Sequence, residues 1–211
     1  MLNRKPVSVL IDQLKNDYWL ARSRAAEALG ELGPDAKQAA PALRNALHDS
    51  HREVGRDAAE ALMRIGPDAS PAVPKLVSLL DHPDLGSYAH RALVAIGEPA
   101  VSALISVLSH PDRGFDAEIV LQAIGDPAIP HLIQALDVEN ESVRSKVISV
   151  ISSIAPLGNE EAIEAMAQLV KSAEESRLHR FLAASALEKI DPAAAAELGI
   201  TGKYKRYLGP R

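Results

Sequence analysis

Apolar residues recur along the chain with the period of one helix face. In one run the apolar positions are Val54, Ala58, Leu62 and Ile65, and residues 85–96 repeat the same pattern. Because spacings of three and four residues return to the same side of an α-helix, each run predicts a helix with one buried face. Alanine in the middle of each run favours close approach of neighbouring helices.

Glycines end these runs about every thirty residues, and each is followed within two residues by proline. Glycine accepts a left-handed cap conformation, and proline cannot continue a helix. A second helical pattern precedes each run, commonly with proline in its first turn, where the missing amide would be unpaired anyway. The sequence therefore predicts stacked helical hairpins, that is, an all-α solenoid. The closing glycines are Gly33, Gly66, Gly97 and Gly125.

Two looser repeats follow and end near Ala155 and Asp191. About six hairpins then fill residues 1–192, which we expect to form the solenoid. We expect residues 193–211 to hold a short capping helix, near residues 193–198, and a basic tail. Terminal segments of repeat arrays are atypical because one of their sides faces water.

Composition narrows the class of protein further. The chain is 47% hydrophobic but only 3% aromatic, so its core must consist of Ala, Leu, Ile and Val, which suits packed helices. The absence of cysteine excludes disulfides, thiol catalysis and thiolate metal sites. No segment reaches the ~18 apolar residues of a membrane span, and the N-terminus does not resemble a signal peptide. We expect a cytoplasmic protein, monomeric by default.

Charge is distributed unevenly along the chain. The formal net charge is −5, yet the last eleven residues hold four basic residues and no acid, so the rest is more acidic than this value. An acidic body argues against nucleic acid as its partner. In the tail, Lys203, Lys205 and Arg206 alternate with Tyr204 and Tyr207, which leaves two alternatives: weak binding of an anion or nucleic acid, or folding back on the body.

The run A-A-x-A-L-G-x-L-G at residues 25–33, with Arg22 three residues before it, resembles the HEAT-like repeat of the variety named after phycobilisome lyases. The resemblance covers residues 7–192. It implies a right-handed α-superhelix whose second helices line the concave face and bind partner proteins. Some relatives act in chromophore attachment, so an accessory protein of the chromophore-lyase type is an alternative, although no motif here marks that activity.

Three middle repeats depart from this family pattern, because glycine replaces its arginine at Gly55, Gly86 and Gly114. Each glycine costs roughly 1 kcal/mol against alanine inside a helix, so something is expected to approach closely. That neighbour is either the adjacent helix or a partner. If it is a partner, alanine at Gly86 and Gly114 should stabilise the fold and weaken binding.

Beside the buried face, the second helices of the middle repeats carry an exposed stripe of acids around an apolar island of Tyr88, Phe115 and Ile119. This arrangement is typical of a surface that binds a basic, partly apolar peptide or helix. The alternative is a solvated helix face with Phe115 tucked between repeats. The candidate partner-binding residues are Asp57, Glu60, Asp84, Gly86, Tyr88, Arg91, Asp112, Gly114, Phe115, Asp116 and Ile119.

Histidines are the remaining candidates for a metal site or for acid–base chemistry. His51, His82 and His110 precede three second helices, but equivalent positions of stacked helices lie ~8–10 Å apart, too far to share a zinc ion. His90 and Glu118 could form an acid–base pair or inter-repeat polar contacts. No nucleophile elbow, phosphate loop or metal motif is present. We therefore expect a non-enzymatic protein-binding scaffold with no catalytic residue, metal or cofactor.

Overall fold

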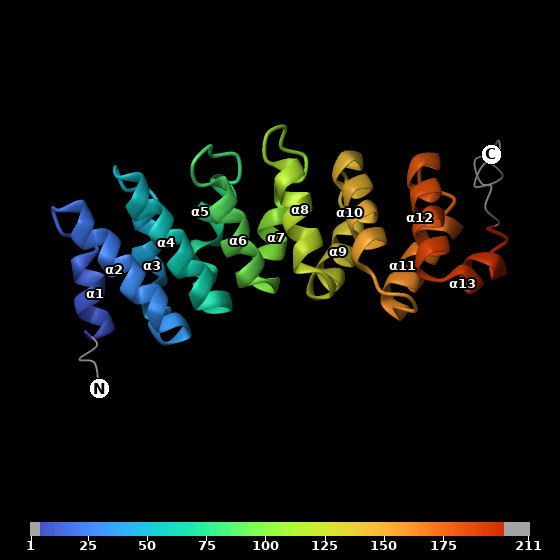
Figure 1. Ribbon diagram of the computed structural model, residues 1–211. Coiled ribbons are helices and arrows are strands. Elements are labelled where there is room, and N and C mark those ends of the chain that lie inside the picture. Colours follow the sequence, from blue (N-terminus) through green and yellow to red (C-terminus); the bar gives the residue numbers. More distant parts are fainter. Residues whose placement is uncertain (1–4, 201–211) are drawn as a thin grey trace. The chain divides into compact units, whose positions relative to one another are not determined.

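The computed structural model describes residues 5–200, which form helices joined by turns and contain no strand (Figure 1). The chain divides into two compact units, residues 1–120 and 121–211. Within each unit, consecutive helices pair as hairpins and the hairpins stack on one another. The basic tail, including Lys203 to Tyr207, lies outside the described residues.

The first unit contains four hairpins, the last of which ends at the boundary inside α8. Its α-helices are α1 Val7–Gln13, α2 Trp19–Leu32, α3 Ala40–Ala46, α4 Arg52–Ile65, α5 Val73–Ser78, α6 Gly86–Ile96, α7 Val101–Ser106 and α8 Gly114–Ile124. Short 3-10 segments join them at η1 Gly33–Ala39, η2 Gly66–Ala72 and η3 Glu98–Ala100. The turns before α6 and α8 lie at the same end of this stack (Figure 1).

The second unit contains two further hairpins and a short last helix. Its elements are η4 Asp126–Ala128, α9 Ile129–Gln134, η5 Ala135–Asp137, α10 Glu141–Ile154, α11 Glu160–Lys171, α12 Arg177–Ile190 and α13 Pro192–Glu197. Helix α13 falls where the sequence predicts a short capping helix. Its N-cap Asp191 accepts hydrogen bonds from the amides of Ala193 and Ala194.

The predicted buried faces are confirmed. All four apolar residues of the run at 54–65 are buried, as are their four counterparts in the run at 85–96. Second helices pack directly on one another, α2 against α4 and α4 against α6. The approach of α2 to α4 is close: a Cβ added at Gly30 would lie 3.1 Å from Ala61 Cα. Small residues at this seam therefore set the spacing between the first two repeats.

The closing glycines behave differently from the left-handed cap that the sequence suggests. Gly33 and Gly97 have φ of 56° and 73° with ψ of −132° and −135°. This region lies outside the left-handed helical one and is adopted almost only by glycine. After Gly33 and Gly66 the chain continues as a seven-residue 3-10 helix, so each glycine redirects the helical path and proline enters the new segment.

Two arginines, one in each unit, join neighbouring hairpins. In the first unit Arg22 donates from Nε and Nη2 to the two carboxylate oxygens of Asp49, at 2.6 and 2.8 Å. In the second unit Arg144 Nη1 lies 3.0 and 3.2 Å from the two oxygens of Glu175. Each guanidinium thus ties one repeat to the next, Arg22 through a two-nitrogen fork and Arg144 through one nitrogen shared by two oxygens.

Within residues 5–200, no single helix has both the length and the apolar character of a membrane span. One bent pair of consecutive helical segments, Gly114–Ile124 with Asp126–Asp137, reaches that threshold when the two are taken together, by length and composition only.

Candidate functional site

Most candidate residues are exposed or half-buried and lie on, or just before, α4, α6 and α8; we call this side the second-helix face. The candidates Gly86 and Gly114 are buried. The candidate residues do not form one continuous site. Asp57 and Glu60 line a shallow hollow of about 60 Å³ between α2 and α4, together with Arg64. Gly86, Arg91 and Asp116 belong to a second, larger space further along the stack.

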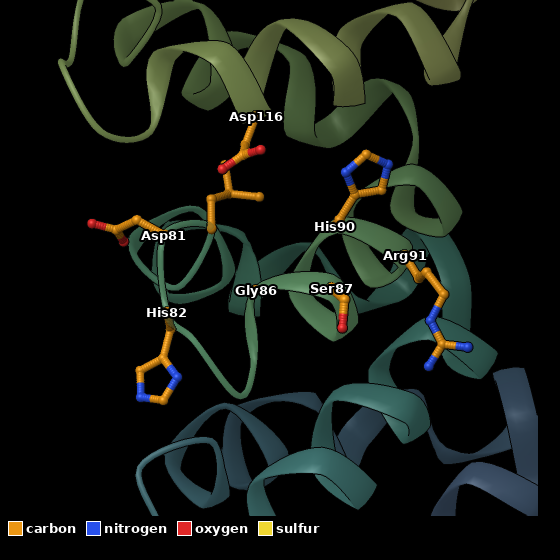
Figure 2. Close-up of a pocket in the computed structure, with 8 residues that line it drawn as sticks. Asp81, His82, Gly86, Ser87, His90, Arg91 and Asp116 are labelled. Carbon is orange, nitrogen blue, oxygen red and sulfur yellow. The ribbon is translucent and has the colours of Figure 1, made fainter.

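This larger space, which we call the α6–α8 hollow, has a volume of about 550 Å³. The end of the first helix in its repeat, the following turn, α6 and α8 all contribute to it (Figure 2). Figure 2 shows Asp116 and His90 on one side of the hollow, whereas His82 and Arg91 extend away from them. Its lining residues are Leu80, Asp81, His82, Gly86, Ser87, His90, Arg91 and Asp116.

Gly86 is explained by the fold. A Cβ added there would lie 2.5 Å from the carbonyl oxygen of Leu80, which lies in the turn after α5. The prediction that alanine at Gly86 stabilises the fold is therefore wrong, because the neighbour is rigid backbone. At Gly55 the nearest atom is the flexible Leu85 Cδ1 at 3.4 Å, an ordinary contact. Gly114 is buried at the start of α8.

Tyr88 is not part of an apolar island. Its ring is flanked by two guanidinium groups, with Arg91 Cζ 4.9 Å and Arg56 Cζ 5.4 Å from the ring centroid. Both cations are attracted by the negative face of the aromatic ring. The arrangement holds Arg91 on α6 and Arg56 on α4 against one ring, so these charges are engaged within the chain.

Phe115 and Ile119 lie on α8 in different surroundings. Phe115 is 68% exposed, so the alternative in which it is tucked between repeats is wrong. Ile119 is half-buried. The exposed apolar surface that the sequence assigns to three side chains therefore comes mainly from Phe115, which stands directly before Asp116 in the first turn of α8.

Several acids of the predicted stripe have partners within the chain. Asp57 accepts a hydrogen bond of 2.5 Å from Ser23 Oγ, and burial raises the pKa of its carboxyl despite that hydrogen bond. Glu60 lies 3.3 Å from Arg64, and Asp84 lies 3.8 Å from Arg52.

The acids nearer to α8 are different. Asp81 and Asp112 are exposed, and Asp116 is half-buried. Across the part of the chain that the structure describes, none of these three carboxylates forms an ion pair. The acidic charge of the second-helix face is therefore least compensated around the α6–α8 hollow and the turn before α8.

Of the three histidines that precede second helices, His82 and His110 have a structural role. His82 Nδ1 accepts hydrogen bonds from the amides of Asp84 and Leu85, and His110 Nδ1 accepts from the two corresponding amides of its own turn. The imidazoles thus satisfy amides at the approach to α6 and α8. His51 instead stacks on Trp19, with ring centroids 3.8 Å apart. No group of three or more potential metal ligands occurs among the described residues.

His90 and Glu118 are not brought together in this hollow: His90 lines it, and Glu118 does not. The structure adds Asp81 and Ser87, which the sequence did not single out. Asp81 lies in a turn of no fixed periodicity, and Ser87 is one position away from the predicted stripe. The sequence marks Ser87 only by its position directly after Gly86, where α6 begins.

Residues 7–87 match the family model described as HEAT repeats. A search of curated proteins finds no match. Among solved structures, the archaeal HEAT-like repeats protein from Thermococcus onnurineus NA1 is similar, with 19% identity over 88% of this chain and 87% of that chain and a TM-score of 0.49. The complex of CpcE and CpcF of phycocyanin lyase from Nostoc sp. PCC7120 has 20% identity over 99% and 95%, with a TM-score of 0.48. An engineered protein has 22% identity over 88% and 96%, with a TM-score of 0.49.

The family match covers the repeats in which the signature is most regular, and the hairpins described above continue through α12. Glycine-ended second helices, proline-started first helices and the arginine joints recur along the chain. The chain has an all-α solenoid architecture, and its residues 7–87 match HEAT repeats.

Proposed function

We propose that this protein is a non-enzymatic binding scaffold whose second-helix face in the first unit holds a basic, partly apolar peptide or helix. The supporting observation is that the arginines of that face have contacts within the chain, whereas two of its carboxylates form no ion pair. Arg56 and Arg91 are held on Tyr88, and Arg64 is close to Glu60. The nearby carboxylates of Asp112 and Asp116 form no ion pair among the described residues, so these two groups are available to attract a cation.

The apolar part of this proposal comes from Phe115. A ring that is 68% exposed beside two acids offers an anchor for an aliphatic or aromatic side chain of the partner. Charge around such an anchor brings basic partners to the surface and sets their orientation, whereas apolar contact supplies most of the affinity.

An accessory role in chromophore attachment would require an acid and a base convergent on a pocket. The three residues that the sequence offers for that role are His90, Glu118 and Tyr88, and only His90 lines the α6–α8 hollow. Tyr88 is occupied by arginines. These positions favour the scaffold over the enzyme.

A random peptide library displayed on phage and panned against the immobilised full chain tests the proposal. We expect enrichment of peptides that combine Lys or Arg with an apolar residue, and weaker binding of the enriched peptides as salt screens the charges. Asp116→Lys should lower their affinity about tenfold, because it reverses an unpaired charge on the face.

Asp68→Lys is the matched control. It makes the same charge reversal at an exposed position in η2, away from the α6–α8 hollow. It should leave the affinity nearly unchanged. Failure to enrich any peptide, or enrichment of acidic peptides, would contradict the proposal.

A further inference from the structure

The α6–α8 hollow is large enough to receive part of a partner. Its volume of about 550 Å³ falls within the ~300–1,000 Å³ typical of ligand sites. Leu80 and Gly86, both buried, form part of its wall. Ser87 and Asp116 add a hydroxyl and a carboxylate. The hollow therefore combines a small apolar surface with hydrogen-bond acceptors.

The charged groups that line the hollow leave it acidic. Arg91 lies on the Tyr88 ring and extends away from Asp116 (Figure 2). His82 also points away, with its Nδ1 occupied by two backbone amides. The carboxylate of Asp116 is half-buried, forms no ion pair in the described chain and lies on the same side of the hollow as His90 (Figure 2).

We propose, as an extension of the proposed function, that the α6–α8 hollow is the specificity pocket for an arginine side chain of the bound peptide, with an adjacent apolar residue of the peptide on Phe115. The arginine donates two hydrogen bonds to Asp116, and its planar group lies beside His90. Arginine suits this geometry better than lysine, because its fork of donors matches a carboxylate and its flat surface stacks on rings.

Phe115 and Asp116 are consecutive residues in the first turn of α8, so their side chains diverge. A short peptide can therefore place an arginine at Asp116 and the neighbouring apolar side chain on the exposed ring of Phe115. This geometry predicts recognition of a two-residue element that contains one arginine and one apolar residue.

Dipeptides test this inference on the full chain. The probes are acetyl-Arg-Phe-amide and acetyl-Phe-Arg-amide, and the matched neutral probes carry citrulline, which keeps the shape of arginine but not its charge. In amide NMR spectra of the 15N-labelled protein, we expect at least one arginine probe to shift Ser87 and Asp116, with a dissociation constant on the order of 1 mM. Citrulline probes should bind about three- to tenfold more weakly.

Asp116→Asn should remove this preference for arginine over citrulline. Asp68→Asn is the matched control, because Asp68 is an exposed acid in η2 that does not line the hollow, and it should retain the preference. The comparison with citrulline needs no variant, so it remains decisive if Asp116→Asn folds poorly.

The outcomes separate this inference from the proposed function. If phage-selected peptides bind but arginine and citrulline probes bind equally, or if Asp116→Asn keeps the preference, the arginine pocket is wrong and the scaffold proposal stands. If neither the selection nor the dipeptides give binding, both are wrong. A preference for arginine that depends on Asp116 supports both.

Discussion

Gly86 shows how packing alone can require glycine at one position. It opens α6 where the backbone of the preceding arm passes so closely that a Cβ would lie 2.5 Å from the Leu80 carbonyl oxygen. At Gly55 a Cβ would meet the flexible Leu85 side chain at 3.4 Å, and the Leu47 carbonyl oxygen is 3.6 Å away, an ordinary contact. Glycines at equivalent positions of two repeats therefore have different surroundings. Substitution by alanine should change the free energy of unfolding in opposite directions at the two positions.

We expect Gly86→Ala to lower the free energy of unfolding by about 1–3 kcal/mol, because backbone must move to admit the methyl group. Gly55→Ala should be neutral or stabilise the fold by up to about 1 kcal/mol, since alanine is the better helix former. Urea unfolding of both variants checks this. Equal stability of Gly86→Ala and the wild type would show that the Leu80 carbonyl is not a rigid neighbour.

At the scale of the element, the sequence predicts the helices well. Apolar periodicity, closing glycines and first-turn prolines place every hairpin from α1 to α12, because these signals are local consequences of burial and backbone conformation. Two structural features could not be predicted from these local sequence signals. The seven-residue 3-10 segments after Gly33 and Gly66 depend on how the next helix packs, and the histidine caps depend on turn geometry that has no period.

The site was less predictable than the helices. Periodicity put Tyr88, Phe115 and Ile119 on one face, but it could not show that two arginines from different helices would flank Tyr88. Nor could it show that Asp81 would share a hollow with Asp116. Such contacts depend on how far each side chain reaches between repeats, which is set by tertiary packing.

The joint between α10 and α12 allows an element-scale prediction about pH. Glu175 is buried, which by itself raises the pKa of its carboxyl, but hydrogen bonds from His179, the Ser176 amide and Arg144 lower this pKa overall. A carboxyl whose folded-state pKa is lowered contributes stability above its unfolded pKa. That contribution is lost as the pH falls through the folded value.

Glu175→Gln should therefore be less stable than the wild type at neutral pH, and the gap should narrow as the pH falls below about 4. Glu174→Gln, at the exposed neighbouring position, should show neither effect. Thermal unfolding followed by circular dichroism over a pH series measures the gap. A gap that stays constant down to acidic pH would mean that the Glu175 carboxylate does not stabilise the joint.

At the scale of the whole molecule, stability in a repeat array is a sum of the stabilities of its repeats and of the contacts between neighbours. This chain divides into two compact units, so a substitution should affect its own unit most. Trp19, the single tryptophan, stacks on His51 within the first unit and therefore reports on that unit alone. Circular dichroism reports on helices of both units.

Gly86→Ala and Glu175→Gln provide a matched pair, one in each unit. We expect Gly86→Ala to lower the midpoint of the Trp19 fluorescence transition in urea, and Glu175→Gln to lower the circular dichroism midpoint while the fluorescence midpoint changes little. The two probes then disagree, because unfolding of the chain is not a single two-state step. If both variants shift both probes equally, the units unfold as one cooperative body, and a peptide bound to the second-helix face would stabilise the whole chain and not only its first unit.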